Sequence, residues 1–225
     1  MGMVAPVVDP PFRRALGQPE PPSAAYLASQ VWTAERVRNE LRDERFHIPR
    51  YELAEGELLV TPSSPAFRHQ IAARELFLLL HPYVVAHGLG EVVWSPGDVE
   101  VLPGTTMEPD LFVVPPDEAR RLLAAGRWRP VTALRLVVEV LSPSTQRNDR
   151  GPKRTYYWRA GVPYWVVDLD ARAIEVSEPG PVLEVRRGDR EVVWHPAGAP
   201  QPLAIDVPAY FERVLGSGAP ADGGS

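Results

Sequence analysis

Apolar and polar positions along the chain form segments with the lengths and periods of short strands and helices. Residues 31–46 have the apolar spacing of a short amphipathic helix, and residues 51–63 alternate on either side of a Glu-Gly turn, which predicts a β-hairpin. A Ser-Pro pair at 64–65 is a typical helix start, and apolar residues then recur at helical spacing. The pattern therefore predicts a hairpin followed by a long, core-facing helix that ends near Gly88.

The rest of the chain alternates between short strands and helices. Strands are expected at 91–95, 98–102, 108–116, 134–141 and 163–170, and in a meander between 173 and 196. Helices are expected at 117–125, around 152–160 and at 207–216. Residues 134–141, LRLVVEVL, are apolar on both alternating faces, as in a central strand covered on both sides. We therefore expect one mixed α/β domain over residues 31–215, with a flexible leader at 1–30 and a flexible tail at 216–225.

The composition is that of a globular protein, with 225 residues, 44% hydrophobic residues and no cysteine. The lack of cysteine excludes disulfides, thiolate metal sites and cysteine nucleophiles, so any metal must bind oxygen or imidazole. The net charge of -5 argues against a protein that coats nucleic acid through bulk charge, although it does not exclude a local basic groove. No apolar stretch reaches the roughly 18 to 20 residues of a bilayer span, and no secretory signal is evident, so we expect a cytoplasmic protein without a membrane partner.

Lysine is almost absent from the chain. Among 24 basic residues, 23 are arginine, and the one lysine is Lys153. Together with 26 prolines, this ratio suggests a GC-rich genome in which lysine drifts to arginine wherever a site needs only positive charge. Chemistry beside a phosphate or a water can require the compact amine of lysine instead. Lys153 has therefore either been retained for chemistry or survived by chance.

Two acidic residues stand in or beside apolar strands. Glu139 lies in the middle of LRLVVEVL, where an ionised carboxylate is costly unless it is paired or holds a metal. Asp110 follows a proline at the start of the strand LFVV. Two carboxylates on two strands suit magnesium, which prefers one or two carboxylates together with water and substrate phosphate. The alternatives are a turn aspartate at position 110 and an arginine ion pair at position 139.

Other candidates lie on the helix that follows the Glu139 strand. Lys153, in its first turn, can lean back over the end of that strand. Asp149, four residues earlier, is expected to cap the helix or to orient Lys153. Tyr157, four residues later, shares the same face and either packs there or touches substrate.

Two further candidates precede these segments. His69 lies in the first turn of the long helix, where it is either a substrate or phosphate contact or an ordinary exposed histidine. Glu57 lies in the second hairpin strand and is either a further catalytic acid or part of the solvent face of that strand.

The order of these segments is similar to that of a known family. The segments are RYELAEGELLVTPSSPAFRHQ, EPDLFVV and LRLVVEVLSPST, followed by Asp149, Lys153, Tyr157, Gly161 and PYWVVD. From about residue 32 to about residue 215, the chain closely resembles the Uma-type family of restriction-endonuclease-like proteins, within the PD-(D/E)xK nuclease superfamily. The resemblance implies a restriction-endonuclease-like α/β fold, with a mixed sheet flanked by helices in a single domain.

The same resemblance implies a site and an activity. Asp110 and Glu139 are the two acids of the motif, and with the main-chain carbonyl of Val140 they are expected to hold Mg²⁺, or Mn²⁺. The superfamily motif has lysine two residues after the second acid, where this chain has Leu141. Lys153 on the following helix is then its replacement. The implied function is a metal-dependent endonuclease that hydrolyses phosphodiester bonds, with DNA as the expected substrate.

Partners follow from the same comparison. Arg147, Arg150 and Arg154 lie after the Glu139 strand and either contact the nucleic-acid backbone or are solvated surface charges. Members of the family are expected to form homodimers. Two alternative functions stay open, namely a catalytically silent nucleic-acid-binding or dimerising module on the same fold, and hydrolysis of another phosphoester.

Overall fold

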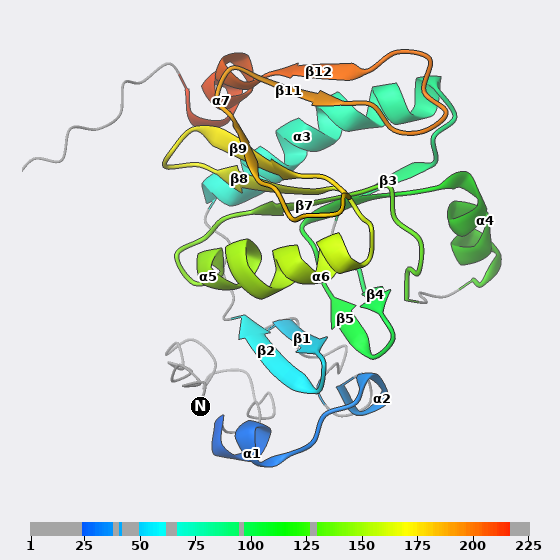
Figure 1. Cartoon of the computed structure of the whole chain (residues 1–225), viewed down its shortest axis with the longest axis vertical. Helices are drawn as coiled ribbons and strands as arrows, with labels where there is room; N and C mark the ends of the chain where they lie inside the picture. Colours follow the sequence, from blue (N-terminus) through cyan, green and yellow to red (C-terminus); the bar gives the residue numbers. More distant parts are fainter. Residues whose placement is uncertain are drawn as a thin grey trace, which may run out of the picture. The chain divides into compact units, whose positions relative to one another are not determined.

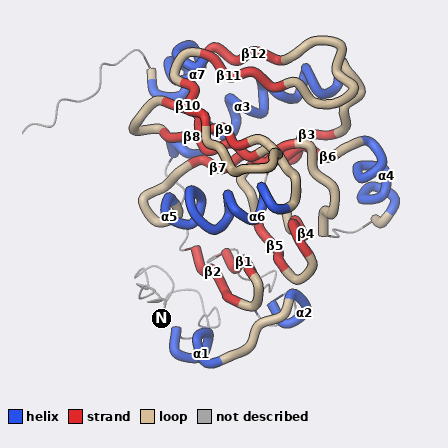
Figure 2. The backbone as a smooth tube through the Cα atoms, in the orientation of Figure 1, coloured by secondary structure: helices blue, strands red, loops and turns tan. Residues whose placement is uncertain are grey.

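The computed structural model describes residues 24–37, 41, 50–61, 67–94, 97–126 and 130–216. The chain divides into two compact units, here called unit 1 (Met1–Ser64 and Leu102–Met107) and unit 2 (Pro65–Val101 and Glu108–Ser225). Figure 1 traces the elements along the chain, and Figure 2 separates helices, strands and loops. Most of the expected leader, residues 1–23, and the expected tail after Gly216 lie outside the described residues.

Unit 1 contains the predicted hairpin. Its elements are α1 (Ala24–Ser29), α2 (Ala34–Arg36), β1 (Arg50–Ala54), β2 (Glu57–Thr61) and β5 (Thr105–Met107). β1 pairs antiparallel with both β2 and β5. Glu55 and Gly56 join β1 to β2 with positive φ angles of 48° and 87°, as a two-residue type I′ turn requires. β5 also neighbours β4 (Val99–Leu102), the strand in which the chain passes from unit 2 to unit 1.

Part of the expected leader is structured, contrary to the prediction. Residues 24–29 form α1, in which Leu27 is buried in a small cluster with Trp32. The indole N–H of Trp32 also donates to the carbonyl of Leu27 at 2.8 Å. A leucine and a tryptophan five residues apart thus pack together and stabilise this segment. The prolines around them made the segment resemble a flexible leader in the sequence.

A six-stranded sheet forms the centre of unit 2. Its strand order is β10-β9-β8-β7-β6-β3, with β7 and β8 parallel and all other pairs antiparallel. The strands are β3 (Glu91–Trp94), β6 (Leu111–Val114), β7 (Leu136–Val140), β8 (Tyr164–Asp168), β9 (Ala173–Ser177) and β10 (Arg186–Gly188). All five residues of β7 are buried, which confirms the prediction of a central strand covered on both faces.

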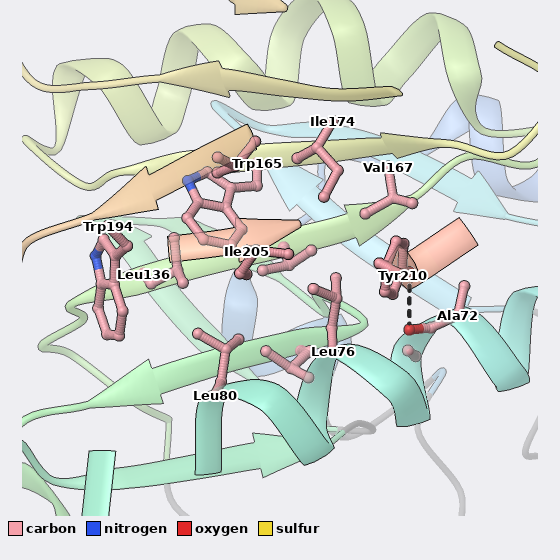
Figure 3. Packing of buried hydrophobic residues seen from close by; sticks show 14 of the residues in the cluster. Ala72, Leu76, Leu80, Leu136, Trp165, Val167, Ile174, Trp194, Ile205 and Tyr210 are labelled. Atoms are coloured by element: carbon pink, nitrogen blue, oxygen red, sulfur yellow. Dashed lines mark hydrogen bonds between the residues drawn. The ribbon is translucent and has the colours of Figure 1, made fainter. Parts of the chain in front are cut away.

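One face of this sheet packs on a large hydrophobic core. It is covered by α3 (Phe67–Ala86), α7 (Val207–Leu215) and the separate pair β11 (Glu191–Trp194) and β12 (Leu203–Asp206). Figure 3 shows Leu76 and Leu80 of α3 beneath Leu136 and Trp165 of the sheet. The hydroxyl of Tyr210 donates to the carbonyl of Ala72 at 3.0 Å, which ties α7 to α3. Among the described residues, no helix has the length and apolar character needed to span a bilayer.

The opposite face carries the segments that matter for the site. They are α4 (Pro116–Ala124), α5 (Gln146–Asn148), the π-helical turn η3 (Asp149–Lys153) and α6 (Arg154–Arg159). Figure 1 shows α5 and α6 on the side of β7 that faces away from α3. The helix expected from about residue 152 therefore begins earlier, at Gln146. Pro152 lies inside the π-helical turn, and because proline has no N–H, the ordinary helical hydrogen bonding is interrupted there.

Glu118 fastens α4 to the chain that leads into β7. Its carboxylate accepts two hydrogen bonds of 2.7 Å from Arg121 and one of 2.6 Å from the backbone N–H of Thr132. The hydrogen bond from Arg121 is the main reason why the pKa of Glu118 is lowered from 4.5 to about 2, while burial acts in the opposite direction. The buried Glu118 carboxylate therefore stays ionised at pH values well below those at which a glutamate ordinarily takes up a proton.

We expect the free energy of unfolding to fall as the pH is lowered from 4.5 towards 2. The folded-state pKa of Glu118 is depressed, so its contribution is complete above pH 4.5 and is lost as the pH falls through about 2. This contribution is on the order of 1 to 3 kcal/mol. Urea unfolding of the wild type and Glu118→Gln between pH 2 and pH 7 tests it. The variant should be less stable above pH 4.5 and show a flatter acid limb, and an equally steep limb would contradict this assignment.

Candidate active site

Strand pairing brings the two predicted acids together. β6 and β7 are antiparallel with Leu111 opposite Val138, so Asp110 and Glu139 are the next residues to face each other. The backbone N–H of Asp110 donates to Glu139 Oε2 at 3.3 Å, and that of Val140 donates to Asp110 Oδ2 at 2.9 Å. Only 4% of Asp110 and 2% of Glu139 is exposed. Two carboxylates thus lie side by side in the sheet, on the face that carries α5 and α6.

Lys153 completes this cluster from the π-helical turn. Its Nζ lies 3.0 Å from Glu139 Oε1 and 3.1 Å from Asp149 Oδ1, and only 3% of the residue is exposed. Of the two roles expected for Asp149, the structure supports the orienting one, because no side-chain hydrogen bond caps this turn. Lys153, which lies 14 residues after Glu139 in the chain, therefore contacts the Glu139 carboxylate directly.

His69 approaches from the first turn of α3. Its Nε2 lies 3.0 Å from Asp110 Oδ2, and the residue is buried. Its Nδ1 is also buried and has no hydrogen-bond partner within the described part of the chain. The structure thus places His69 beside the acids, where it fixes the orientation of the Asp110 carboxylate.

Two stacked tyrosines lie beside the π-helical turn, and one of them donates a hydrogen bond to it. Tyr157, expected to pack or to touch substrate, is fully buried and stacks on Tyr164 with ring centroids 4.8 Å apart. Tyr164 donates its hydroxyl to the carbonyl of Asp149 at 3.0 Å. Burial raises the pKa of Tyr164 well above 10, the charges of Glu139 and Asp149 raise it further, and Lys153 lowers it. The Tyr164 hydroxyl therefore stays protonated and remains a donor to the turn.

The arginines expected to contact nucleic acid do not share one environment. Arg147 is exposed on α5. Arg150 binds both Asp168 and Glu175, and Arg154 is buried and binds Glu175. In this arrangement Arg150 and Arg154 are held by carboxylates of β8 and β9, whereas Arg147 is exposed.

Three further acids bear on the predicted set, one that was predicted and two that were missed. Glu57, expected as a further acid or a solvent-facing residue, is exposed on β2 in unit 1, as the solvent-facing interpretation requires. Glu52 on β1 is buried, and the sequence analysis missed it. Glu175, also missed, lies in AIEVS, where a lone carboxylate between apolar residues repeats the signal that identified Glu139.

The carboxylates of this site are oxygen donors, the kind of ligand that the divalent cation expected from the sequence prefers. Within the described ranges there is no group of three or more His, Asp or Glu side chains that could hold a metal ion. Asp110 and Glu139 nevertheless occupy opposed positions on neighbouring strands, and magnesium is commonly held by only one or two carboxylates, with water and phosphate completing its shell. The donor set therefore fits a hard cation that binds together with a phosphate substrate.

Comparisons with known proteins identify a family and a structure with a similar fold. The family model Uma2, described as "Putative restriction endonuclease", matches residues 39–204. Among solved structures, a protein from Anabaena variabilis described as "a putative nuclease belonging to DUF820" matches with a TM-score of 0.66. The two sequences are 18% identical, and the match covers 82% of this chain and 99% of that one, which establishes a shared fold. None of the curated proteins compared with the chain matches it significantly.

Proposed function

The chain belongs to the Uma2 putative restriction endonuclease family, and from this premise we propose that it is a metal-dependent endonuclease that cleaves phosphodiester bonds in DNA. The proposal includes a cytoplasmic homodimer, because cutting both strands of a duplex is most directly done by two copies related by symmetry. The alternative of a catalytically silent module on the same fold is an outcome of the experiments below.

The observation that carries the proposal is the contact between Lys153 and Glu139. A buried amine lies 3.0 Å from one carboxylate of an adjacent pair, which is the arrangement of charges that phosphodiester hydrolysis needs. The only lysine of the chain is the residue found there. The composition and the geometry thus single out Lys153 independently of each other.

Each side chain has a distinct task in this proposal. Asp110 and Glu139 would hold Mg²⁺, which supplies positive charge to the phosphate and lowers the pKa of a water molecule. Lys153 donates from Nζ, so it can orient the attacking water or neutralise charge that develops on the phosphoryl oxygens. Asp149 keeps that amine beside Glu139, and His69 keeps the Asp110 carboxylate in place.

The function is tested by incubating supercoiled and linear DNA with the purified full chain. Cleavage is expected with Mg²⁺ or Mn²⁺ and none with a chelator present. Single-stranded DNA, RNA and a small phosphodiester complete the substrate panel, since cleavage of the small ester alone would favour a different phosphoester hydrolase. Absence of cleavage together with absence of metal binding would favour the silent module.

We expect metal binding to depend on Asp110 even without substrate. Asp110→Asn keeps the size of the side chain but removes one of the two negative charges, so the Kd for Mn²⁺ should rise at least about tenfold. Titration calorimetry or the electron paramagnetic resonance of free Mn²⁺ measures this directly. Asp117→Asn on α4, which alters an exposed carboxylate paired with Arg120, is the matched control and should leave the Kd unchanged. Equal Kd values in the wild type and Asp110→Asn would remove Asp110 from the metal site.

A further inference from the structure

Glu175 lies in line with Glu139 across the central sheet. The strand register pairs Glu139 with Val166 of β8, and Val166 with Glu175 of β9. Directly opposed residues project from the same face of a sheet, and strands are spaced about 4.8 Å apart, so the two carboxylates share one face at a separation of about 10 Å between their backbones. Both acids therefore face the segment that contains the π-helical turn.

Glu175 holds this segment through two arginines. Arg150 donates from Nε at 2.9 Å and from Nη2 at 2.7 Å to Glu175 Oε1, while Arg154 binds Glu175 Oε2. Arg150 also binds Asp168 on the neighbouring strand. Each oxygen of Glu175 thus binds one arginine, and the two arginines stand on either side of Lys153 in the chain.

The backbone of the turn departs from ordinary helical geometry just before Lys153. Gly151 and Pro152 precede it inside a π-helical turn, a conformation that is rare and that lacks ordinary helical hydrogen bonding. The flexible stem of lysine must also lose rotamer entropy to hold its amine in one place. Anchors on both sides of the turn are therefore needed to keep Nζ beside Glu139.

The charges of Glu175, Arg150 and Arg154 favour the ion pairs that join them. Burial favours the neutral form of Glu175, but the hydrogen bonds from Arg150 and Arg154 outweigh this effect and lower its pKa. Arg154 is itself buried, and its Nε has no hydrogen-bond partner within the described residues. Removing the Glu175 charge would leave a buried guanidinium poorly paired, so the turn would have to shift to resolvate it.

We propose that Glu175 is a positioning residue that sets the place of the Lys153 amine by binding Arg150 and Arg154 on either side of it. The catalytic consequence rests on the proposed nuclease function, whereas the structural consequence does not. In this assignment, Arg150 and Arg154 are internal anchors of the active-site turn and Glu175 is their shared counter-ion.

The single lysine makes the test specific. Reductive methylation of the full chain with ¹³C-formaldehyde labels only Lys153 and the N-terminal amine, and the two signals are resolved by NMR. In folded Glu175→Gln we expect Lys153 to be methylated at least about tenfold faster than in the wild type, because a loosened turn exposes the amine. We expect kcat for DNA cleavage to fall about ten- to a hundredfold with KM nearly unchanged, as for a misplaced catalytic group. Glu175→Asp, which retains the charge, should partly reverse both changes.

Glu118→Gln is the matched control for a merely structural effect. Glu118 is also a buried carboxylate of unit 2 that binds an arginine, but it lies on α4 and its hydrogen bonds join it to Arg121 and Thr132. This variant should lose stability and yet keep the wild-type methylation rate of Lys153 and the wild-type kcat. A Glu175→Gln protein that methylates Lys153 no faster than Glu118→Gln does would overturn the proposal.

Two contingencies are covered by the same measurements. If Glu175→Gln does not fold, Arg150→Gln can be used instead, because it removes only the partly exposed arginine bound to Glu175. This variant should accelerate the methylation of Lys153 by a smaller factor. No acceleration would contradict the positioning role of Glu175. If the wild type cleaves no DNA, the nuclease proposal fails, and the methylation rates alone still decide whether Glu175 positions Lys153.

Discussion

Lys153→Arg is expected to lower kcat for metal-dependent DNA cleavage by roughly 10²- to 10³-fold, the cost of losing one preorganised charge at a reacting phosphate. The Lys153 amine fits between Glu139 and Asp149 at 3.0 and 3.1 Å, in a site that leaves only 3% of the residue exposed. A planar guanidinium keeps the positive charge but is too large for this space and donates in a different geometry. Charge alone is therefore insufficient at position 153.

The measurement is a comparison of initial cleavage rates for the wild type, Lys153→Arg and Lys153→Met at saturating Mg²⁺. Both variants should still bind Mn²⁺, since the two carboxylates remain. Arg120→Lys, the reverse exchange at an exposed position on α4, controls for nonspecific effects and should cleave normally. Wild-type activity in Lys153→Arg would show that the only lysine of the chain was not retained for chemistry.

Local pattern was sufficient to predict the elements whose structure depends on neighbours in the chain. The hairpin turn, the long helix and the buried strand β7 all follow from the spacing of apolar residues and from turn residues. β5 and β12 were missed because they are only three and four residues long, too short to show a clear alternation of apolar and polar residues. The early start of the helix at Gln146 was missed because Pro152 is a typical helix start, whereas here it lies inside a π-helical turn.

The site residues divide in the same way, into those that neighbouring residues in the sequence identify and those whose contacts depend on distant segments. Asp110, Glu139 and Lys153 stand out locally, as two acids beside apolar residues and as the only lysine. The pairing of Arg150 and Arg154 with Glu175 depends on the register of β8 with β9, which no local pattern specifies. The two arginines therefore seemed equally suited to solvent or to nucleic acid in the sequence, although the isolated carboxylate in AIEVS was a signal that one strand needed cations.

Glu139→Gln is expected to lower kcat by at least about a thousandfold, because Glu139 serves both the metal and the lysine. The amide keeps the shape of the side chain but has only one acceptor oxygen, so it can accept either from the Asp110 backbone N–H or from Lys153, and Asp149 remains as a charged partner for the amine. We therefore expect the loss of stability to stay below the roughly 3 to 5 kcal/mol typical of breaking a buried ion pair. Cleavage assays, Mn²⁺ binding and urea unfolding separate these effects, and near-wild-type cleavage would exclude Glu139 from the site.

The double variant Glu139→Gln with Lys153→Met decides whether these residues act as a unit. Groups that work together lose most of their effect when either one is removed, so the double variant should be about as inactive as Glu139→Gln alone. Independent groups would instead show losses in kcat that multiply. Multiplying losses would mean that the 3.0 Å contact between Lys153 Nζ and Glu139 Oε1 is an ion pair of the folded protein and that the lysine acts elsewhere in the reaction. Matching losses would place the amine and the carboxylate in the same chemical step.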